Sequence, residues 1–195
     1  AGLLRDGIDQ QCYKRPQKSL AREIYEEDFS AVDGQVDAFD MVSLAEMLGA
    51  MAQQQYAHSD FLSLTDEYMI KGFRQPKREL EYFLRFPQVF ARSLVSRARV
   101  LIDESGREVF RIATPHMVRA LTDLGARDVL RLTTAWAMLG PRDPYALAAL
   151  ETRLTELLEF ARDMDAEDVD AGCWAVKELQ LGQPLLQRLE SVRPE

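Results

Sequence analysis

Residues that carry chemistry are scarce in this chain of 195 residues. It has only two cysteines, Cys12 and Cys173, and no CxxC pair, which argues against the disulfide framework of a small secreted protein. His58 and His116 are its only histidines, and neither has another metal-ligating residue at the spacing of a metal site. A glycine-rich phosphate loop and a GxSxG motif are also missing. We therefore predict no catalytic residue, no cofactor and no metal site, and a chain that is not an enzyme.

Long apolar runs and an excess of positive charge are missing too. No apolar stretch reaches the roughly 20 residues that span a bilayer, so we expect no membrane insertion. The formal net charge is −8, the wrong sign for general binding to phosphate groups. The one strongly positive part is 71–119, with a net charge of +6, between segments of −10 (21–70) and −6 (120–195). We therefore expect negligible RNA binding, and we expect any that occurs to involve 71–99.

The first part of the chain differs in charge from the acidic majority. Residues 1–20 carry a net charge of +2. This fits either the remnant of an organellar transit peptide or an extended arm. We predict an extended arm over 1–17 and a single helical-repeat domain over 18–195.

Helix signals dominate the rest of the chain. Leucines recur at three- or four-residue steps over 145–161, as on the buried face of a helix. Asp143-Pro144 and Thr114-Pro115 each predict a helix start, with an N-cap residue followed by proline in the first turn. Val100–Asp103 and Arg107–Ile112 could pair as a β-hairpin, although we favour helix for the first half. The pattern predicts an all-α chain with helices over 18–28, 37–54, 59–73, 77–85, 87–103, 114–124, 127–139, 144–163, 166–180 and 184–191.

A large residue between two small ones recurs near the ends of predicted helices. The copies are Ala50-Met51-Ala52, Ala135-Trp136-Ala137 and Cys173-Trp174-Ala175, and a degenerate copy would lie near 91–99. Small residues let two antiparallel helices approach closely, while the large residue fills the groove to the neighbouring pair. Such pairs must stack to cover their apolar faces. We therefore predict an α-solenoid of about four helix pairs rather than a generic helical bundle, with Trp136 and Trp174 buried.

Two stretches of these repeats resemble a known class of proteins. They are LTTAWAMLGPRDPYALAAL and DAGCWAVKELQLGQPLLQRL, within 127–189, and a weaker resemblance covers 41–70. The chain is similar here to organellar helical-repeat proteins of the pentatricopeptide (PPR), octotricopeptide and FAST-kinase-type class. The resemblance implies a mitochondrial or plastid protein, and many members of the class bind single-stranded RNA. It identifies a repeat class and no activity.

Size, acidity and repeat type together favour a docking function. They resemble the PPR-like accessory subunit on the catalytic head of the F-type ATP synthase in euglenids and kinetoplastids. The resemblance implies a non-catalytic subunit on the matrix side of mitochondria, with the α subunit of that head as its partner. The alternatives are an organellar RNA-processing or ribosome-associated protein and, less well matched, a peptide-binding solenoid of the TPR class.

A basic and aromatic segment is the predicted partner-binding region. Aromatic residues and arginine dominate the energetics of protein interfaces. We expect Phe73, Tyr82 and Phe86 to be exposed anchors there. The predicted partner-binding residues are Arg74, Lys77, Arg78, Tyr82, Arg85 and Phe86.

Overall fold

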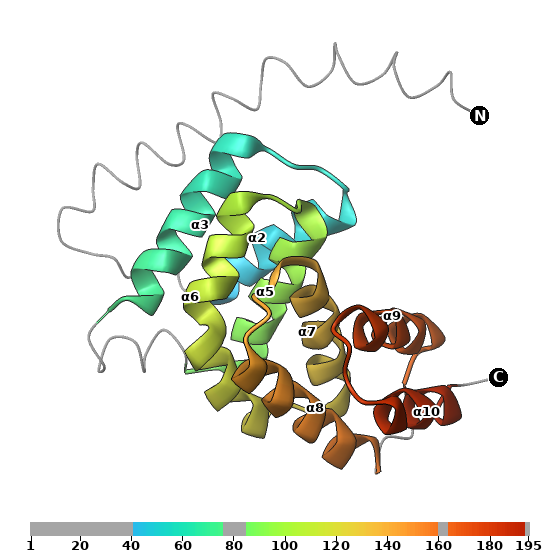
Figure 1. The fold of residues 1–195 in the computed structure, drawn as a ribbon. Helices are drawn as coiled ribbons and strands as arrows, with labels where there is room; N and C mark the ends of the chain where they lie inside the picture. The colour runs from blue at the N-terminus through green and yellow to red at the C-terminus, as the bar shows by residue number, and fades with distance from the viewer. Residues whose placement is uncertain (1–40, 76–84, 160–163, 194–195) are drawn as a thin grey trace, which may run out of the picture. The chain divides into compact units, whose positions relative to one another are not determined.

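The computed structural model describes residues 41–75, 85–159 and 164–193, which all lie within one compact unit, 41–195 (Figure 1). In these ranges every regular element is a helix, so the predicted all-α fold is confirmed. Three predicted elements lie outside the described residues: the arm over 1–17, the helix over 18–28 and the helix over 77–85. Only Arg85 of the last one is described. No helix in the described ranges is both long enough and apolar enough to cross a membrane.

The described helices form consecutive pairs along the chain. They are α2 (Met41–Gln53), α3 (Ser59–Phe73), α5 (Pro87–Val100), α6 (Glu104–Ala120), α7 (Ala126–Leu139), α8 (Pro144–Leu158), α9 (Ala166–Glu178) and α10 (Gln183–Ser191), with the short 3-10 helix η1 (Leu121–Asp123) after α6. The first helices of the pairs form one row, in which α2 packs on α5, α5 on α7 and α7 on α9. The second helices form another, with α3 on α6, α6 on α8 and α8 on α10. This packing in two rows is consistent with the predicted α-solenoid.

Side chains in the short links start the second helix of three pairs. Asp143 accepts the Ala146 N–H at 2.8 Å, and proline follows it in the first turn of α8, as predicted. Asp103 accepts the Gly106 N–H at 2.8 Å at the start of α6. At the start of α3, the Nδ1 of His58 accepts the Phe61 N–H at 3.3 Å. Each bond satisfies an N–H that the helix itself leaves unpaired, which fixes where the chain turns back.

The predicted helix start at Thr114-Pro115 is wrong, and so is the hairpin alternative over 100–112. The chain forms α5, a link over 101–103, and then α6, with Pro115 inside that helix. Proline removes one backbone hydrogen bond from a helix interior. Pro115 lies on the exposed side, however, while Val109, Phe110 and Met117 remain fully buried across it. Burial of that apolar face holds the helix together through the proline.

Two links contain the same left-handed turn. Gln55 after α2 and Gln180 after α9 have φ angles of 49° and 56°, and no other described residue has a positive φ. In both, the next residue donates its N–H at 3.0 Å to a carbonyl five residues earlier, that of Met51 in α2 and Val176 in α9. These are Schellman-type helix ends. Val176 is therefore the structural equivalent of Met51.

The repeated triplets do not all have the same register. Met51 and Trp136 are the eleventh residues of α2 and α7, whereas in α9 the eleventh is Val176 and Trp174 is the ninth. Trp136 is fully buried, as predicted, but Trp174 is 47% exposed, so the prediction of its burial is wrong. Two residues rotate a side chain by about 200° around a helix axis. Trp174 therefore points away from the side on which Val176 is buried.

The degenerate copy predicted near 91–99 lies in α5 as Ser96-Arg97-Ala98. Arg97 is the eleventh residue of α5 and, like Trp136, is fully buried. The small residues of the other copies vary: Ala135 and Ala175 are buried, Ala52, Ala137 and Cys173 are partly buried, and Ala50 is exposed. Position in the helix thus determines burial better than the triplet does.

An ionic cluster joins α7 to α9. Asp168 of α9 is buried and accepts hydrogen bonds from Arg127 and Arg131 of α7, each at 2.9 Å. Burial opposes ionisation of this carboxyl, but the bonds from Arg131 and Arg127 outweigh it, so the pKa of Asp168 is lowered. Arg127 also pairs with Asp165, the residue before α9. Asp165 has the N-cap position of α9 without a side-chain cap bond, and Asp168 in the first turn binds the arginines.

Candidate protein-binding surface

An aromatic cluster organises the region of the predicted binding residues. The Phe73 ring of α3 meets the Phe90 ring of α5 edge to face, with ring centroids 5.6 Å apart. It also stacks on the His116 ring of α6 at 5.6 Å. Phe73 is only 4% exposed, so its predicted role as an exposed anchor is wrong. Burial lowers the pKa of His116, against an opposing bond to the Phe73 backbone. The cluster brings together the end of α3, the first turn of α5 and the last part of α6.

Arg85 and Phe86 lie at the entrance of α5 and are both exposed. Pro87 starts the helix, so Phe86 has extended backbone, with φ −118° and ψ 92°, at the N-cap position. Its ring is 51% exposed, and the Arg85 guanidinium lies over it at 5.4 Å from the ring centroid. This cation–π contact presents a charge and an apolar face together. The predicted exposure of Phe86 is confirmed.

Two further arginines extend this feature along α5. Arg92 and Arg99 are seven residues apart, which places them on nearly the same side of α5, while Arg85 precedes the helix. All three are exposed, and none has an ion-pair partner within the described residues. We call Arg85, Phe86, Arg92 and Arg99 the α5 surface. Arg92 and Arg99 are not among the predicted binding residues, although their seven-residue spacing could have revealed them.

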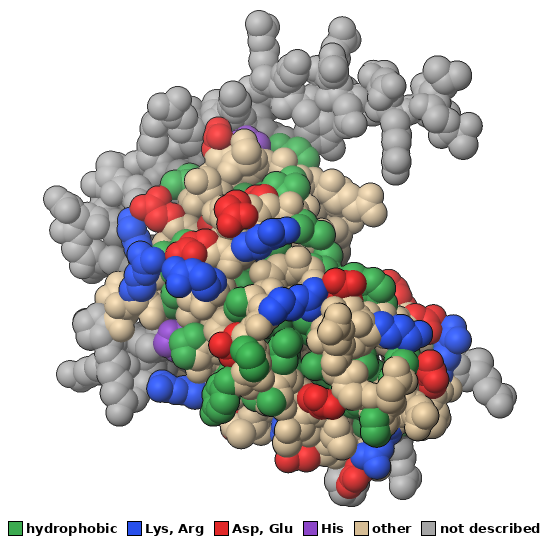
Figure 2. Space-filling model, viewed as in Figure 1, with side chains coloured by type: hydrophobic (Ala, Val, Ile, Leu, Met, Phe, Trp, Pro, Cys, Tyr) green, Lys and Arg blue, Asp and Glu red, His purple; other side chains and the backbone are tan. Residues whose placement is uncertain are grey.

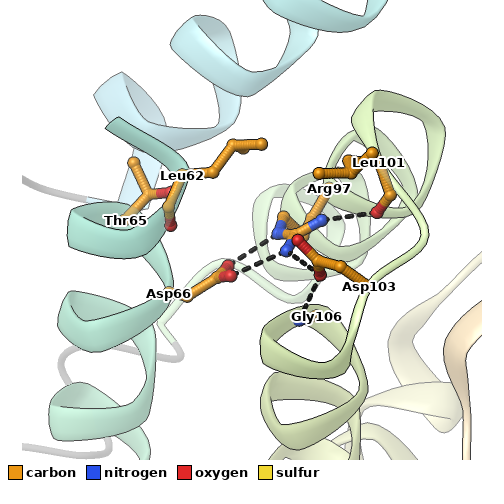
Figure 3. Close-up of polar contacts among 7 residues, drawn as sticks. All are labelled: Leu62, Thr65, Asp66, Arg97, Leu101, Asp103 and Gly106. Atoms are coloured by element: carbon orange, nitrogen blue, oxygen red, sulfur yellow. Dashed lines mark hydrogen bonds and ion pairs between the residues drawn. The ribbon is translucent and has the colours of Figure 1, made fainter. Parts of the chain in front are cut away.

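Arg97 is the exception in this basic helix, because it points inward (Figure 3). Its Nε and Nη2 donate to the two carboxylate oxygens of Asp66 on α3, at 2.6 and 2.7 Å. Nη2 also donates to Asp103 at 2.6 Å, and Nη1 to the Leu101 carbonyl at 2.7 Å. Burial alone would lower the pKa of Arg97, but the bonds to Asp66 and Asp103 raise it, so the charge is retained. Arg97 therefore ties α3, α5 and the start of α6 together and takes no part in a surface.

The other predicted binding residues divide into two groups. Arg74 ends α3, is exposed, and has its Nη2 3.6 Å from Glu108 on α6, which Arg111 also binds at 2.6 Å. The Arg111 bond lowers the pKa of Glu108, so an anionic partner is already present beside Arg74. Lys77, Arg78 and Tyr82 lie outside the described residues.

Two shallow hollows of about 380 Å³ lie in the surface, and neither is lined by residues of the α5 surface. One, between α9 and α10, is lined by Asp170, Cys173, Trp174, Lys177, Glu190 and Arg193. The other, between α8 and the end of α6 with η1, has Ala148 and Ala149 in its lining and the exposed Tyr145 beside them. Within the described residues, no three His, Cys, Asp or Glu side chains are close enough together to hold a metal ion.

The visible face mixes apolar, basic and acidic side chains without a deep cleft (Figure 2). Comparison with protein-family models, with curated proteins and with solved structures finds no match for this chain. The function is therefore inferred from the described surfaces and from the resemblance of the repeats to the PPR class.

Proposed function

We propose that the chain is a non-catalytic accessory subunit that binds a larger protein complex through the α5 surface. The observation that carries this proposal is the exposed Arg85–Phe86 contact at the start of α5, the helix that also carries the exposed Arg92 and Arg99. None of the three arginines has an ion-pair partner among the described residues. An exposed aromatic ring beside arginine is the composition of interface hot spots. A partner with an acidic patch next to an apolar pocket fits such a surface. The arginines would steer and orient its approach more than they add affinity.

The catalytic head of the mitochondrial F-type ATP synthase is the first candidate partner, through its α subunit. This part of the proposal comes from the resemblance of the repeats to the PPR-like accessory subunit on that head. On this proposal, the chain lies on the matrix side of mitochondria. The solenoid would supply a rigid support, since each pair of helices is fixed to the next by packing and by buried ion pairs such as Arg97–Asp66.

The experiment is affinity purification of the tagged full-length chain from mitochondria, with co-purified proteins quantified by mass spectrometry. We compare the wild type with Arg92→Glu/Arg99→Glu and with a matched double variant, Arg107→Glu/Arg119→Glu. Arg107 and Arg119 are also exposed and without ion-pair partners in the described chain, but they lie on α6. Loss of ATP synthase subunits with the α5 variant alone is the expected result. Equal recovery with both variants would place the docking face elsewhere, and absence of the synthase from all samples would reject that partner.

Single-stranded RNA is the second candidate ligand, because arginines beside an exposed aromatic ring also hold unpaired bases. The net charge of −8 opposes it, since a strand longer than the α5 surface would meet acidic surface. Fluorescence anisotropy with a labelled oligonucleotide at physiological salt distinguishes the two proposals. Negligible binding is expected. Tight binding with a steep salt dependence, lost with Arg92→Glu/Arg99→Glu, would support an RNA-associated function instead.

A further inference from the structure

Among the described helices, α9 is the last in the row α2–α5–α7–α9, and α10 lies beside it (Figure 1). Asp170, Cys173, Trp174 and Lys177 are spaced i, i+3, i+4 and i+7, so they share one face of α9. The opposite side packs on α7, where a Cβ on Gly172 would overlap the Leu130 side chain. We call the four residues the α9 end face. It is the face on which a further helix of the row would pack.

This face has an apolar centre formed by Cys173 and Trp174. Trp174 is 47% exposed, because the triplet in α9 lies two residues earlier in its helix than that of α7. Cys173 beside it is partly buried and is a free thiol whose pKa burial raises, so it behaves as a small apolar side chain. This face and α10 together line an open surface hollow of about 380 Å³. A large ring beside a hollow is the arrangement that a partner surface fills.

The charges around this centre are self-complementary. Asp170 and Lys177 lie equally far on either side of the midpoint between Cys173 and Trp174. If a second α9 packs antiparallel around that midpoint, Asp170 of each copy lies opposite Lys177 of the other. Farther out, Glu167 lies opposite Gln180, so no like charges meet along this line. Within the described residues Lys177 has no ion-pair partner, and Asp170 has only the exposed Arg193 at 2.8 Å.

We propose that the α9 end face binds a second copy of this chain, with the two α9 helices antiparallel around a two-fold axis. In such an interface the same patch is used by both subunits. Each Trp174 packs beside Cys173 of the partner and toward the hollow between its α9 and α10. The two Asp170–Lys177 pairs at the ends fix the direction of the helices. This homodimer does not depend on the α5 surface or on its ligand.

Sedimentation equilibrium of the full-length chain over a wide concentration range tests the association. We expect a reversible monomer–dimer equilibrium. Trp174→Ala should weaken it about tenfold or more, because it removes the central aromatic contact. Tyr145→Ala is the matched control, since Tyr145 is still more exposed but lies at the start of α8. A wild type that stays monomeric, or a dimer unaffected by Trp174→Ala, would overturn the proposal.

Charge reversal tests the antiparallel pairing itself. Asp170→Lys and Lys177→Glu should each weaken self-association, because each sets like charges opposite one another. Mixed together, the two variants should form a heterodimer, since both pairs across the axis then have opposite charges. Circular dichroism of each variant confirms that the fold is retained. Failure of the mixture to associate, with both variants folded, would reject this arrangement.

A thiol cross-link locates the axis. Cys12→Ser leaves Cys173 as the only cysteine of the chain. Because Cys173 lies next to the proposed axis, a short bis-maleimide should join two copies, and Trp174→Ala in the same background should reduce the yield. A partner protein cross-linked in place of a second copy would show that this face binds another chain and would contradict the homodimer.

Discussion

Trp136 and Trp174 have the same sequence setting in α7 and α9, yet one ring is fully buried and the other is half exposed. Trp136 lies between the two rows, with its ring centroid 5.3 Å from that of Phe110 on α6. In α9 the corresponding interior position is held by Val176. The comparison teaches that register within a helix, and not local composition, decides which residues a repeat directs into the core.

The same comparison explains which small residue allows close packing. In α7 the alanine before Trp136 is buried, as expected for a helix crossing. In α9, Gly172, one position before the triplet, lies against α7, because a Cβ there would overlap the Leu130 side chain. In α9 the large residue of the triplet is therefore turned outward, while two small residues, Gly172 and Ala175, are buried.

Replacement of each tryptophan by alanine is the most direct test of the difference in burial between the two rings. Trp136→Ala should lower the free energy of unfolding by about 3–5 kcal/mol, because it opens a cavity between the rows. Trp174→Ala should cost less than about 1 kcal/mol in the monomer, because half of its ring is already in water. Urea denaturation of both variants at low protein concentration checks this. Equal costs would mean that the two rings are in equivalent environments.

The position of Trp136 in α7 is occupied in α5 by a charge, which gives a second test. Arg97→Met leaves Asp66 and Asp103 without their cationic partner and should cost about 3–5 kcal/mol. Asp66→Leu added to Arg97→Met should recover part of this loss, since one unpaired buried carboxylate is removed as well. A double-mutant cycle by denaturation measures the coupling. Strictly additive effects would show that the 2.6 Å contact between Arg97 and Asp66 contributes no net interaction.

Much of this fold could be predicted from the sequence, because helix starts are local signals. The helix over 59–73 has the predicted bounds, and Asp143 caps α8 as its position before Pro144 indicates. The predicted helix start at Thr114-Pro115 is wrong because a proline interrupts a helix only where burial does not hold the chain together across it. Register is not local. It depends on where the neighbouring helix lies, and the triplet around Trp174 contains no information about that.

The candidate surface could be predicted only in part. Phe86 precedes a proline and is correctly placed outside the helix. The burial of Phe73 could have been found, since it continues the spacing of Leu62 and Met69 on one face of α3. Arg97 likewise falls on the apolar face that contains Phe90 and Leu94, but no sequence rule supplies its partner. Asp66 is 31 residues away, and only the fold brings the two together.

Glycine-to-alanine changes test how closely α9 approaches α7. Gly172→Ala should cost about 1–3 kcal/mol, because the new methyl group overlaps Leu130 in a packed core. Gly49→Ala is the control within α2, where the nearest atom is the Ser96 Oγ at 3.7 Å. There the change should stabilise by about 0.5–1 kcal/mol through helix propensity alone. The same sign for both, measured by thermal unfolding, would mean that α9 does not approach α7 this closely.

A pH titration probes the contact of α3 with α6. The pKa of His116 is lowered in the folded protein by burial, so the unfolded chain binds the proton more tightly. The contribution of neutral His116 is complete above the unfolded-state pKa of about 6.5 and is lost progressively as the pH falls from there through the lowered pKa of the folded protein. His116→Gln should remove this part of the pH dependence. Identical slopes of unfolding free energy against pH for both proteins would show that the ring is not buried against Phe73.

The smallest expected effect, a gain, tests the equivalence of α2 and α9. Gln55 and Gln180 both have positive φ, where a residue with a Cβ is strained and glycine is not. Gln180→Gly and Gln55→Gly should therefore each raise the free energy of unfolding, by about 0.5–1 kcal/mol. Gln54→Gly, one position earlier and without positive φ, should lower it, because glycine there only adds freedom to the unfolded chain. A gain at Gln55 with a loss at Gln180 would mean that α9 ends differently from α2, and Val176 would lose its place as the equivalent of Met51.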